Sequence, residues 1–295
     1  MKSKFITHSL RLLAFLCILN ACTDASGRKS RLNVWSYNML FDYNWVAKSP
    51  DQTWCQRMPH LMEAIRQHRP DIIGTQELQT FQVRGVVAMS GYGWVGISMK
   101  GNREGLWAEN AAIFYNRDRL EVVDEGNFWF SETPNTPRTY SWGMKYCRMC
   151  TWGKFRDRQT GHIFALLNSH FYVDADKEEA RKHAARLVLS KAKEFLQEGI
   201  PVICTGDLNA TIDNESVQIL LQDGTLKDTY ALARHPRGPQ GSFHGFGKYP
   251  EPKKRIDHVL VSSAFRVKDY EIIDEQLRTR QWQSDHLPVS VVLSF

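Results

Sequence analysis

Short apolar runs that end at polar side chains recur along this chain. Leu32 and Val34 alternate with polar positions and lead to Asn38, which predicts a strand that ends at an amide. A short buried strand is predicted over residues 71–77, and it ends at Glu77. Each of these strands therefore presents an oxygen-bearing side chain at the edge of a sheet.

The same pattern predicts strands through the rest of the chain. They are expected at residues 111–115, 128–130, 147–155, 163–169, 200–205, 256–261 and 289–293. A turn at Thr160-Gly161 separates two neighbouring strands of this set. Two of these strands lead directly to His170 and to Asp207, so polar groups again follow apolar runs.

Helical spacing is clearest in two segments. In the first segment, Met58, Leu61, Met62 and Ile65 recur at helical spacing, and Pro70 ends the helix. In the second, the apolar residues are Ala180, Ala184, Leu187, Val188 and Phe195, and Gly199 ends the helix. Asn214 is expected to cap a shorter helix that runs through Leu221. Long strand-rich stretches lack crossover helices, so the pattern predicts an α/β fold with packed mixed sheets, not a doubly wound parallel sheet.

The first 30 residues read as a targeting segment. Lys2, Lys4 and Arg11 precede an apolar run over residues 12–19, which is too short to span a bilayer, and Ala21-Cys22 follows. We expect residues 1–21 to be a lipoprotein signal peptide, 22–30 a tether and 31–295 one domain. The protein is then exported and anchored to a membrane through lipid on Cys22, in the periplasm or at the cell surface. Asn20 departs from the commonest pattern and leaves cleavage by the ordinary signal peptidase open.

Composition adds a mild positive charge. The 295 residues are 42% apolar and 24% charged, with 38 basic against 32 acidic side chains. Loss of the three basic residues of the leader lowers the surplus to +3. This surplus permits a phosphate-bearing substrate without demanding nucleic acid. Residues 253–255 hold much of it, and a solvated loop is the default explanation for that run.

Four cysteines remain beyond Cys22. Cys147 and Cys150 form a C-x-x-C, but no second pair completes a four-thiolate zinc site. The motif is not at a strand-to-helix junction, so we interpret it as strand sequence. Export permits a disulfide, whose partners the sequence does not assign.

Six short segments together resemble the endonuclease/exonuclease/phosphatase superfamily. They are residues 36–38, 71–77, 168–170, 206–209, 256–258 and 284–289, in the family's order. Residues 206–209, Gly-Asp-Leu-Asn, form the sharpest of them, although alone they also fit a strand-end turn. The resemblance implies a four-layered α/β sandwich of two packed mixed sheets flanked by helices, with the site at one edge.

The resemblance also implies a metal site. Glu77 matches the family's principal metal carboxylate, Asn38 lies beside it, and Asp285 contributes directly or through water. Magnesium suits such oxygen ligands and keeps waters for chemistry, with manganese as a substitute.

Catalytic roles follow from the same resemblance. Asp207 orients or deprotonates the attacking water, Asn209 holds a phosphate oxygen, and His286 binds a non-bridging oxygen. His170 contacts phosphate and protonates the leaving oxygen, with Asp257 fixing its tautomer.

Three further residues are weaker candidates. Glu109 is a loose match to a second partner of His170, and Arg148, ahead of a strand, is a candidate phosphate ligand. His244 lies in a glycine-rich loop and is a candidate substrate contact.

These residues imply an exported, Mg²⁺-dependent phosphoesterase that cleaves phosphodiesters or phosphomonoesters by in-line attack of water. A nuclease acting on nucleic acid or nucleotides, a sphingomyelinase-like enzyme and an inositol phosphate phosphatase all agree with the catalytic set. The alternative from another class of function is a binding protein, which has the same fold, is not catalytic and binds a phosphate ligand. We expect a monomer.

Overall fold

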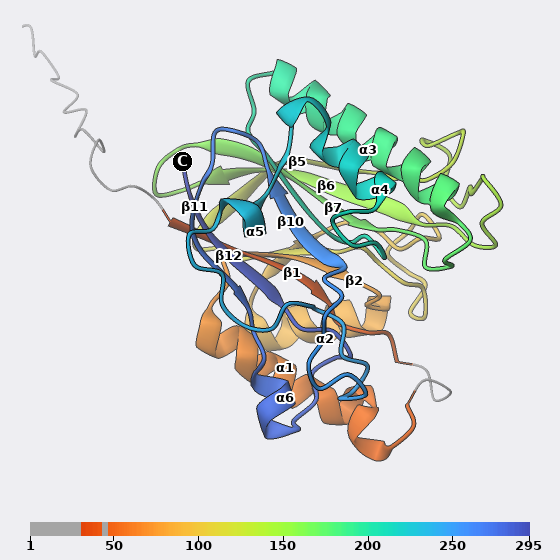
Figure 1. The fold of residues 1–295 in the computed structure, drawn as a ribbon, viewed down its shortest axis with the longest axis vertical. Helices are drawn as coiled ribbons and strands as arrows, with labels where there is room; N and C mark the ends of the chain where they lie inside the picture. Colours follow the sequence, from red (N-terminus) through yellow and green to blue (C-terminus); the bar gives the residue numbers. More distant parts are fainter. Residues whose placement is uncertain (1–30, 43–46) are drawn as a thin grey trace, which may run out of the picture.

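The computed structural model describes residues 31–42 and 47–295, and it contains two six-stranded mixed sheets packed face to face (Figure 1). The first sheet has the order β11-β12-β1-β2-β4-β3, from β1 (Arg31–Asn38), β2 (Ile72–Gln76), β3 (Gly93–Val95), β4 (Ile113–Tyr115), β11 (Arg266–Ile272) and β12 (Val289–Ser294). The second has the order β5-β6-β7-β8-β10-β9, from β5 (Leu120–Trp129), β6 (Met149–Asp157), β7 (Ile163–His170), β8 (Val202–Asp207), β9 (Lys227–Asp228) and β10 (Asp257–Val261). β1 pairs with β2, and β7 with β8, in parallel; the other pairs are antiparallel.

Helices form the two outer layers. The first sheet is covered by α1 (Trp54–His68) and α2 (Thr80–Ser90), with α6 (Glu275–Thr279) beside α1 (Figure 1). The second is covered by α3 (Glu178–Gln197) and α4 (Glu215–Leu221), while α5 (Thr229–Leu232) is a single turn after β9. Two 3₁₀ turns lie at Pro50–Gln52 and Gln222–Gly224. The expected four-layered sandwich is confirmed.

Alternation along the strands divides the core into layers. Leu166 and Ile203 pack between the two sheets, whereas their neighbours Leu167 and Cys204 face the α3 layer. On β1, Val34 points between the sheets in the same way. Both faces of each sheet are therefore buried, which explains why the strand sequences read as nearly continuous apolar runs.

At one end of the sandwich, polar contacts replace apolar packing between the sheets. Gln76 Nε2 donates to Asn168 Oδ1 at 2.7 Å, and the Gly206 amide donates to Ser36 Oγ at 2.9 Å. A Cβ at Gly74 would lie 1.9 Å from Thr205 Oγ1, so only glycine lets the backbones approach this closely. We call these contacts the inter-sheet seam.

The proposed signal peptide and tether lie outside the described residues. None of the helices that the structure describes is long and apolar enough to cross a membrane. Cys147 precedes β6 and Cys150 lies within it, in agreement with the strand interpretation, and the cysteines of the described part are free thiols.

Candidate active site

A cavity of about 530 Å³ opens at the end of the sandwich that carries the inter-sheet seam. Its polar lining is Glu77, Glu109, Arg148, His170, Asp207, Asn209, Asp285 and His286. Six strands meet at this end of the sandwich. The parallel strands β1, β2, β7 and β8 end here, and β10 and β12, which run antiparallel to them, begin here. Side chains from both sheets thus converge on one cavity, as the sequence predicts.

Asn38 joins the two central carboxylates. Its Nδ2 donates to Glu77 Oε1 at 2.9 Å and to Asp207 Oδ2 at 3.0 Å. Its Oδ1 accepts the Leu40 amide at 3.0 Å, so the amide group is fixed in orientation. Glu77 itself has a left-handed backbone (φ 70°), an uncommon conformation for a non-glycine residue that concentrates at functional sites.

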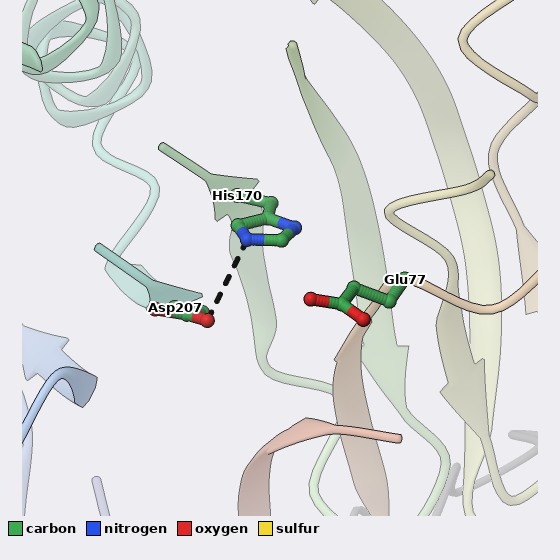
Figure 2. A group of neighbouring side chains, drawn as sticks. All are labelled: Glu77, His170 and Asp207. Atoms are coloured by element: carbon green, nitrogen blue, oxygen red, sulfur yellow. Dashed lines mark ion pairs between the residues drawn. The ribbon is translucent and has the colours of Figure 1, made fainter. Parts of the chain in front are cut away.

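The carboxylates fit a divalent cation. Glu77 Oε2 is buried and has no hydrogen-bond partner among the described residues. Burial, followed by the nearby Asp285 carboxylate, raises the pKa of Glu77 to about 8. Oxygen ligands crowded in this way are the usual partners of a hard ion. Glu77, His170 and Asp207 also place ligand atoms within 4.8 Å of one another, and Figure 2 shows their side chains converging.

Asp207 is the acceptor at the centre of the cavity. Its Oδ1 accepts the Asn209 amide at 2.9 Å, and its Oδ2 lies 3.5 Å from His170 Nε2 and 3.7 Å from His286 Nε2. Burial and the neighbouring Asp257 raise the pKa of Asp207 to about 6. Asp207 therefore stands between both histidines and is placed to hold a water molecule.

His286 is oriented by Asp257. The His286 Nδ1–H group donates to Asp257 Oδ2 at 2.7 Å, and both side chains are buried. Burial disfavours the charged imidazolium, yet the Asp257 carboxylate raises the pKa of His286 well above its ordinary value. The Asp257 carboxylate thus favours the protonated form of His286, whose ring lines the cavity.

His170 has a different partner from the one the sequence predicts. Arg148 Nη1 lies 2.9 Å from His170 Nδ1 and 2.9 Å from Glu109 Oε2. Because arginine only donates, His170 Nδ1 must accept, and the ring proton stays on Nε2. Burial and the Arg148 charge hold the pKa of His170 well below its ordinary value. His170 is thus a neutral ring that donates from Nε2.

The expectation that Asp257 fixes the tautomer of His170 is therefore wrong. Asp257 starts β10 and faces the segment before β12, so His286 takes its carboxylate. Glu109 reaches His170 only through Arg148. The acid role expected of His170 loses support, because burial and the Arg148 charge against Nδ1 disfavour the protonated ring, although Asp207 lies 3.5 Å from Nε2.

Asn209 and His244 differ in their access to the cavity. Asn209 lines it, with a left-handed backbone (φ 49°) and with Nδ2 donating to Phe171 O at 3.0 Å. His244 has no exposed surface; its Nδ1 accepts the Gly247 amide, and its ring stacks on Trp282. The structure therefore does not bring His244 into contact with a substrate in the cavity, contrary to expectation.

Arg57, which no sequence pattern singled out, positions two segments that lead into the site. It is fully buried and donates to the carbonyls of Met39, Leu40 and Gln283 at 2.8, 3.0 and 2.8 Å. These carbonyls belong to the segments that carry Asn38 and Asp285, so Arg57 fixes both to α1. The sequence feature that could have indicated this role is the position of Arg57 on the apolar face of α1, at helical spacing from the buried residues Trp54 and Leu61.

The chain matches the Endonuclease/Exonuclease/phosphatase family over residues 33–286. An endonuclease/exonuclease/phosphatase family protein from Bacteroides thetaiotaomicron is 32% identical, with a TM-score of 0.83 over 91% of this chain and 99% of that one. A mannosyl-6-phosphatase from the same organism is also 32% identical, with a TM-score of 0.81 over 90% and 100%. The catalytic domain of human nocturnin shares the fold at 18% identity, with a TM-score of 0.70 over 90% and 94%. No curated protein matches the chain.

The fold and the converging carboxylates and histidines define a phosphoesterase of the two-sheet sandwich type. This chain belongs to the endonuclease/exonuclease/phosphatase family. Enzymes of the family generally depend on a divalent metal, and the donor set at Glu77 agrees with that dependence.

Proposed function

We propose that this protein is a Mg²⁺-dependent hydrolase that releases a terminal phosphate from small phosphorylated molecules. The observation that carries the proposal is the cavity itself. It combines a buried carboxylate oxygen without a partner at Glu77 with N–H donors at Arg148, His170 and His286. The first feature suits a cation, and the second suits the oxygens of a phosphate.

The side chains divide the chemistry between them. Glu77 and Asp285, with Asn38 holding Glu77 in place, would bind the cation. When bound, a divalent ion supplies positive charge to the phosphoryl group. Asp207 orients the attacking water and accepts its proton, and the leaving oxygen takes up a proton from solvent as the alcohol is released. His286 and His170 donate from Nε2 to phosphate oxygens, where negative charge grows as the bond to the leaving group breaks.

Two observations favour a small phosphomonoester over a polymer. A cavity of about 530 Å³ is within the range that encloses most of a small ligand. The mannosyl-6-phosphatase, by its name a sugar phosphatase, matches nearly the full length of this chain at 32% identity. Nuclease, sphingomyelinase-like and inositol phosphate activities remain the alternatives that a substrate panel distinguishes.

The experiment is a hydrolysis assay with Mg²⁺, with Mn²⁺ and with chelator, which measures inorganic phosphate from the phosphomonoesters and the released alcohol or phosphomonoester from the phosphodiesters. Its substrates are hexose 6-phosphates, nucleotides, inositol phosphates, sphingomyelin, single-stranded DNA and bis-p-nitrophenyl phosphate. We expect the highest kcat/KM on a hexose phosphate and no turnover in chelator. Full activity in chelator would contradict the metal dependence, and no turnover of any ester would favour a binding protein.

We also propose that the protein is an exported monomer anchored through lipid at Cys22. The support is the basic lead, the eight apolar residues that follow it and Ala21-Cys22. Mass spectrometry of the native protein should give an acylated N-terminus at Cys22, and size-exclusion chromatography in detergent should give one protein chain per particle. A chain that starts at Met1 in the cytoplasm would refute the localisation.

A further inference from the structure

A second hollow lies beside the catalytic cavity, and the two share one wall. Its volume is about 490 Å³, and Phe243 lines both spaces. The Phe243 ring packs edge-on against His286, with centroids 5.0 Å apart, and lies 5.9 Å from the Tyr249 ring. A group in this hollow is therefore separated from the reacting phosphate by about one aromatic ring.

The hollow carries an unneutralised positive charge. Lys248, Lys253 and Lys254 line it, against one acidic residue, Glu251. Lys248 Nζ lies 5.1 Å from the centroid of the Tyr249 ring. Within the described residues, none of the three lysines forms an ion pair. The lining therefore offers cations next to an aromatic surface, a combination that suits an anionic group carried on a ring.

The segment that forms the hollow, residues 241–255, is bonded to the catalytic residues. The amides of His244 and Gly245 both donate to Asp285 O at 3.0 Å, and the Leu287 amide donates to Ser242 O at 2.7 Å. The two ends of the segment are joined by Gly241 N to Pro252 O at 2.8 Å. The hollow is thus held in a fixed position relative to Asp285 and His286.

Its far end is also fixed. Arg255 donates to both carboxylate oxygens of Asp228, at 3.0 and 2.7 Å, and its guanidinium lies over Tyr230. Ser242 Oγ accepts the amides of Ile256 and Asp257 at 3.2 and 3.1 Å. A plain solvated loop accounts for exposed lysines, but not for this anchoring or for a wall shared with the catalytic cavity.

We propose that the second hollow binds a second phosphate, carried on the same ring-containing molecule whose first phosphate is cleaved. The inference rests on the proposed function, because it takes the first phosphate to lie beside His286. Phe243 and Tyr249 contact the ring of the substrate, and the three lysines bind the second phosphate as point charges. The preferred substrates are then bisphosphorylated sugars or nucleosides.

The test compares matched substrates that differ by one phosphate. The pairs are mannose 6-phosphate with mannose 1,6-bisphosphate, and adenosine 5′-monophosphate with adenosine 3′,5′-bisphosphate. In at least one pair we expect kcat/KM to be about tenfold higher for the bisphosphate, mainly through KM. The pair with the larger preference identifies the ring, and Tyr249→Leu should reduce that preference. Raised salt should shrink it, because exposed charges are screened.

The variant K248Q/K253Q/K254Q should bring the ratio of the two kcat/KM values close to one. Lys268→Gln, an exposed lysine on β11, is the matched control and should leave the ratio unchanged. Equal kcat/KM within both pairs for the natural protein would overturn the inference. So would a preference that survives in the triple variant.

A binding measurement separates this inference from the proposed function. If no ester in the panel is hydrolysed, the proposed function fails, but calorimetry with adenosine 3′,5′-bisphosphate and mannose 1,6-bisphosphate still tests the hollow. At least one should bind about tenfold more weakly to the triple variant than to the natural protein or to Lys268→Gln. Equal affinities for all three proteins would overturn the inference.

Discussion

The two histidines that line the cavity lie at similar distances from the Asp207 carboxylate, but their pKa values are shifted in opposite directions. His170 Nε2 and His286 Nε2 are 3.5 and 3.7 Å from Asp207 Oδ2. The guanidinium of Arg148 lies against His170 and lowers the pKa of that ring further than burial alone. The carboxylate of Asp257 lies against His286 and raises the pKa of that ring. Burial disfavours the charged form of both rings, so the residue behind each ring decides the outcome.

The comparison separates the position of a side chain from its role. Both rings direct a donor into the cavity, but only the neighbour of His286 favours a positive charge on the ring. In the proposed function, His286 and Arg148 would balance the charge on the phosphate, while His170 would supply a neutral hydrogen bond. Substitutions should therefore affect the two sides unequally.

The largest loss of activity should follow from a substitution at the cation site, on which both histidine sides of the cavity depend. Glu77→Gln removes the main protein charge that would hold the cation, and we expect phosphoesterase activity to fall by about a hundredfold or more. Initial rates over a Mg²⁺ titration measure it, with the surface variant Glu63→Gln as control. Unchanged activity in Glu77→Gln would sink the hydrolytic mechanism offered here.

Asp257→Asn tests the His286 side alone. The change keeps the size of the side chain and removes the charge that stabilises the imidazolium. We expect kcat to fall by about a hundredfold, within the range for loss of oxyanion stabilisation. The surface variant Asp269→Asn is the control. If Asp257→Asn retained full kcat, the charge on His286 would have no part in the reaction.

His170→Gln tests the opposite side. Glutamine also donates a hydrogen bond, and a neutral donor is what the structure assigns to His170. We expect about a tenfold loss, equal for a nitrophenyl ester and an alkyl ester, because His170 passes no proton to the leaving group. A much larger loss on the alkyl ester would restore the acid role that the sequence predicted.

A third histidine extends the comparison to stability. His258 Nδ1 faces Arg255 and its Nε2 faces Ala210 O, and burial and Arg255 lower its pKa to about 4. In the unfolded chain the pKa of a histidine is about 6.5, so the unfolded chain takes up the proton at a higher pH than the folded protein does. The contribution of His258 to the free energy of unfolding is therefore fully present above about pH 6.5 and is lost as the pH falls from about 6.5 to 4. Urea unfolding at pH 7.5 and 5.0 should show His258→Gln losing ~2 kcal/mol less than the natural protein over this interval. His235→Gln, at an exposed position, should lose as much as the natural protein.

The apolar pattern predicted packed mixed sheets, and the family resemblance added the four-layered sandwich and the candidate site residues, which lie in short local motifs. Strand-end motifs such as those at Glu77 and Asp207 place a functional group at a known edge of a sheet. The partner of a histidine is not local: Asp257 and His286 are 29 residues apart, and only the packing of β10 against the segment before β12 decides which ring receives the carboxylate.

The missed elements have weak local signals. The helix α2 was not expected from the sequence, because its start is capped by Gln79 instead of a usual serine, threonine or aspartate cap. Nor was β11, an edge strand with a bulge between Val267 and Asp269 that interrupts the alternation. The function of Arg57 depends on backbone carbonyls that approach it only after folding.

The inter-sheet seam makes the candidate site depend on the docking of the two sheets. Glu77 and Asp285 follow or precede strands of the first sheet, whereas His170, Asp207 and Asp257 belong to the second. Neither sheet alone contains a cation site, a base and an oriented imidazolium. Recovery of turnover after unfolding therefore requires both sheets to be docked, with Gln76 bonded to Asn168.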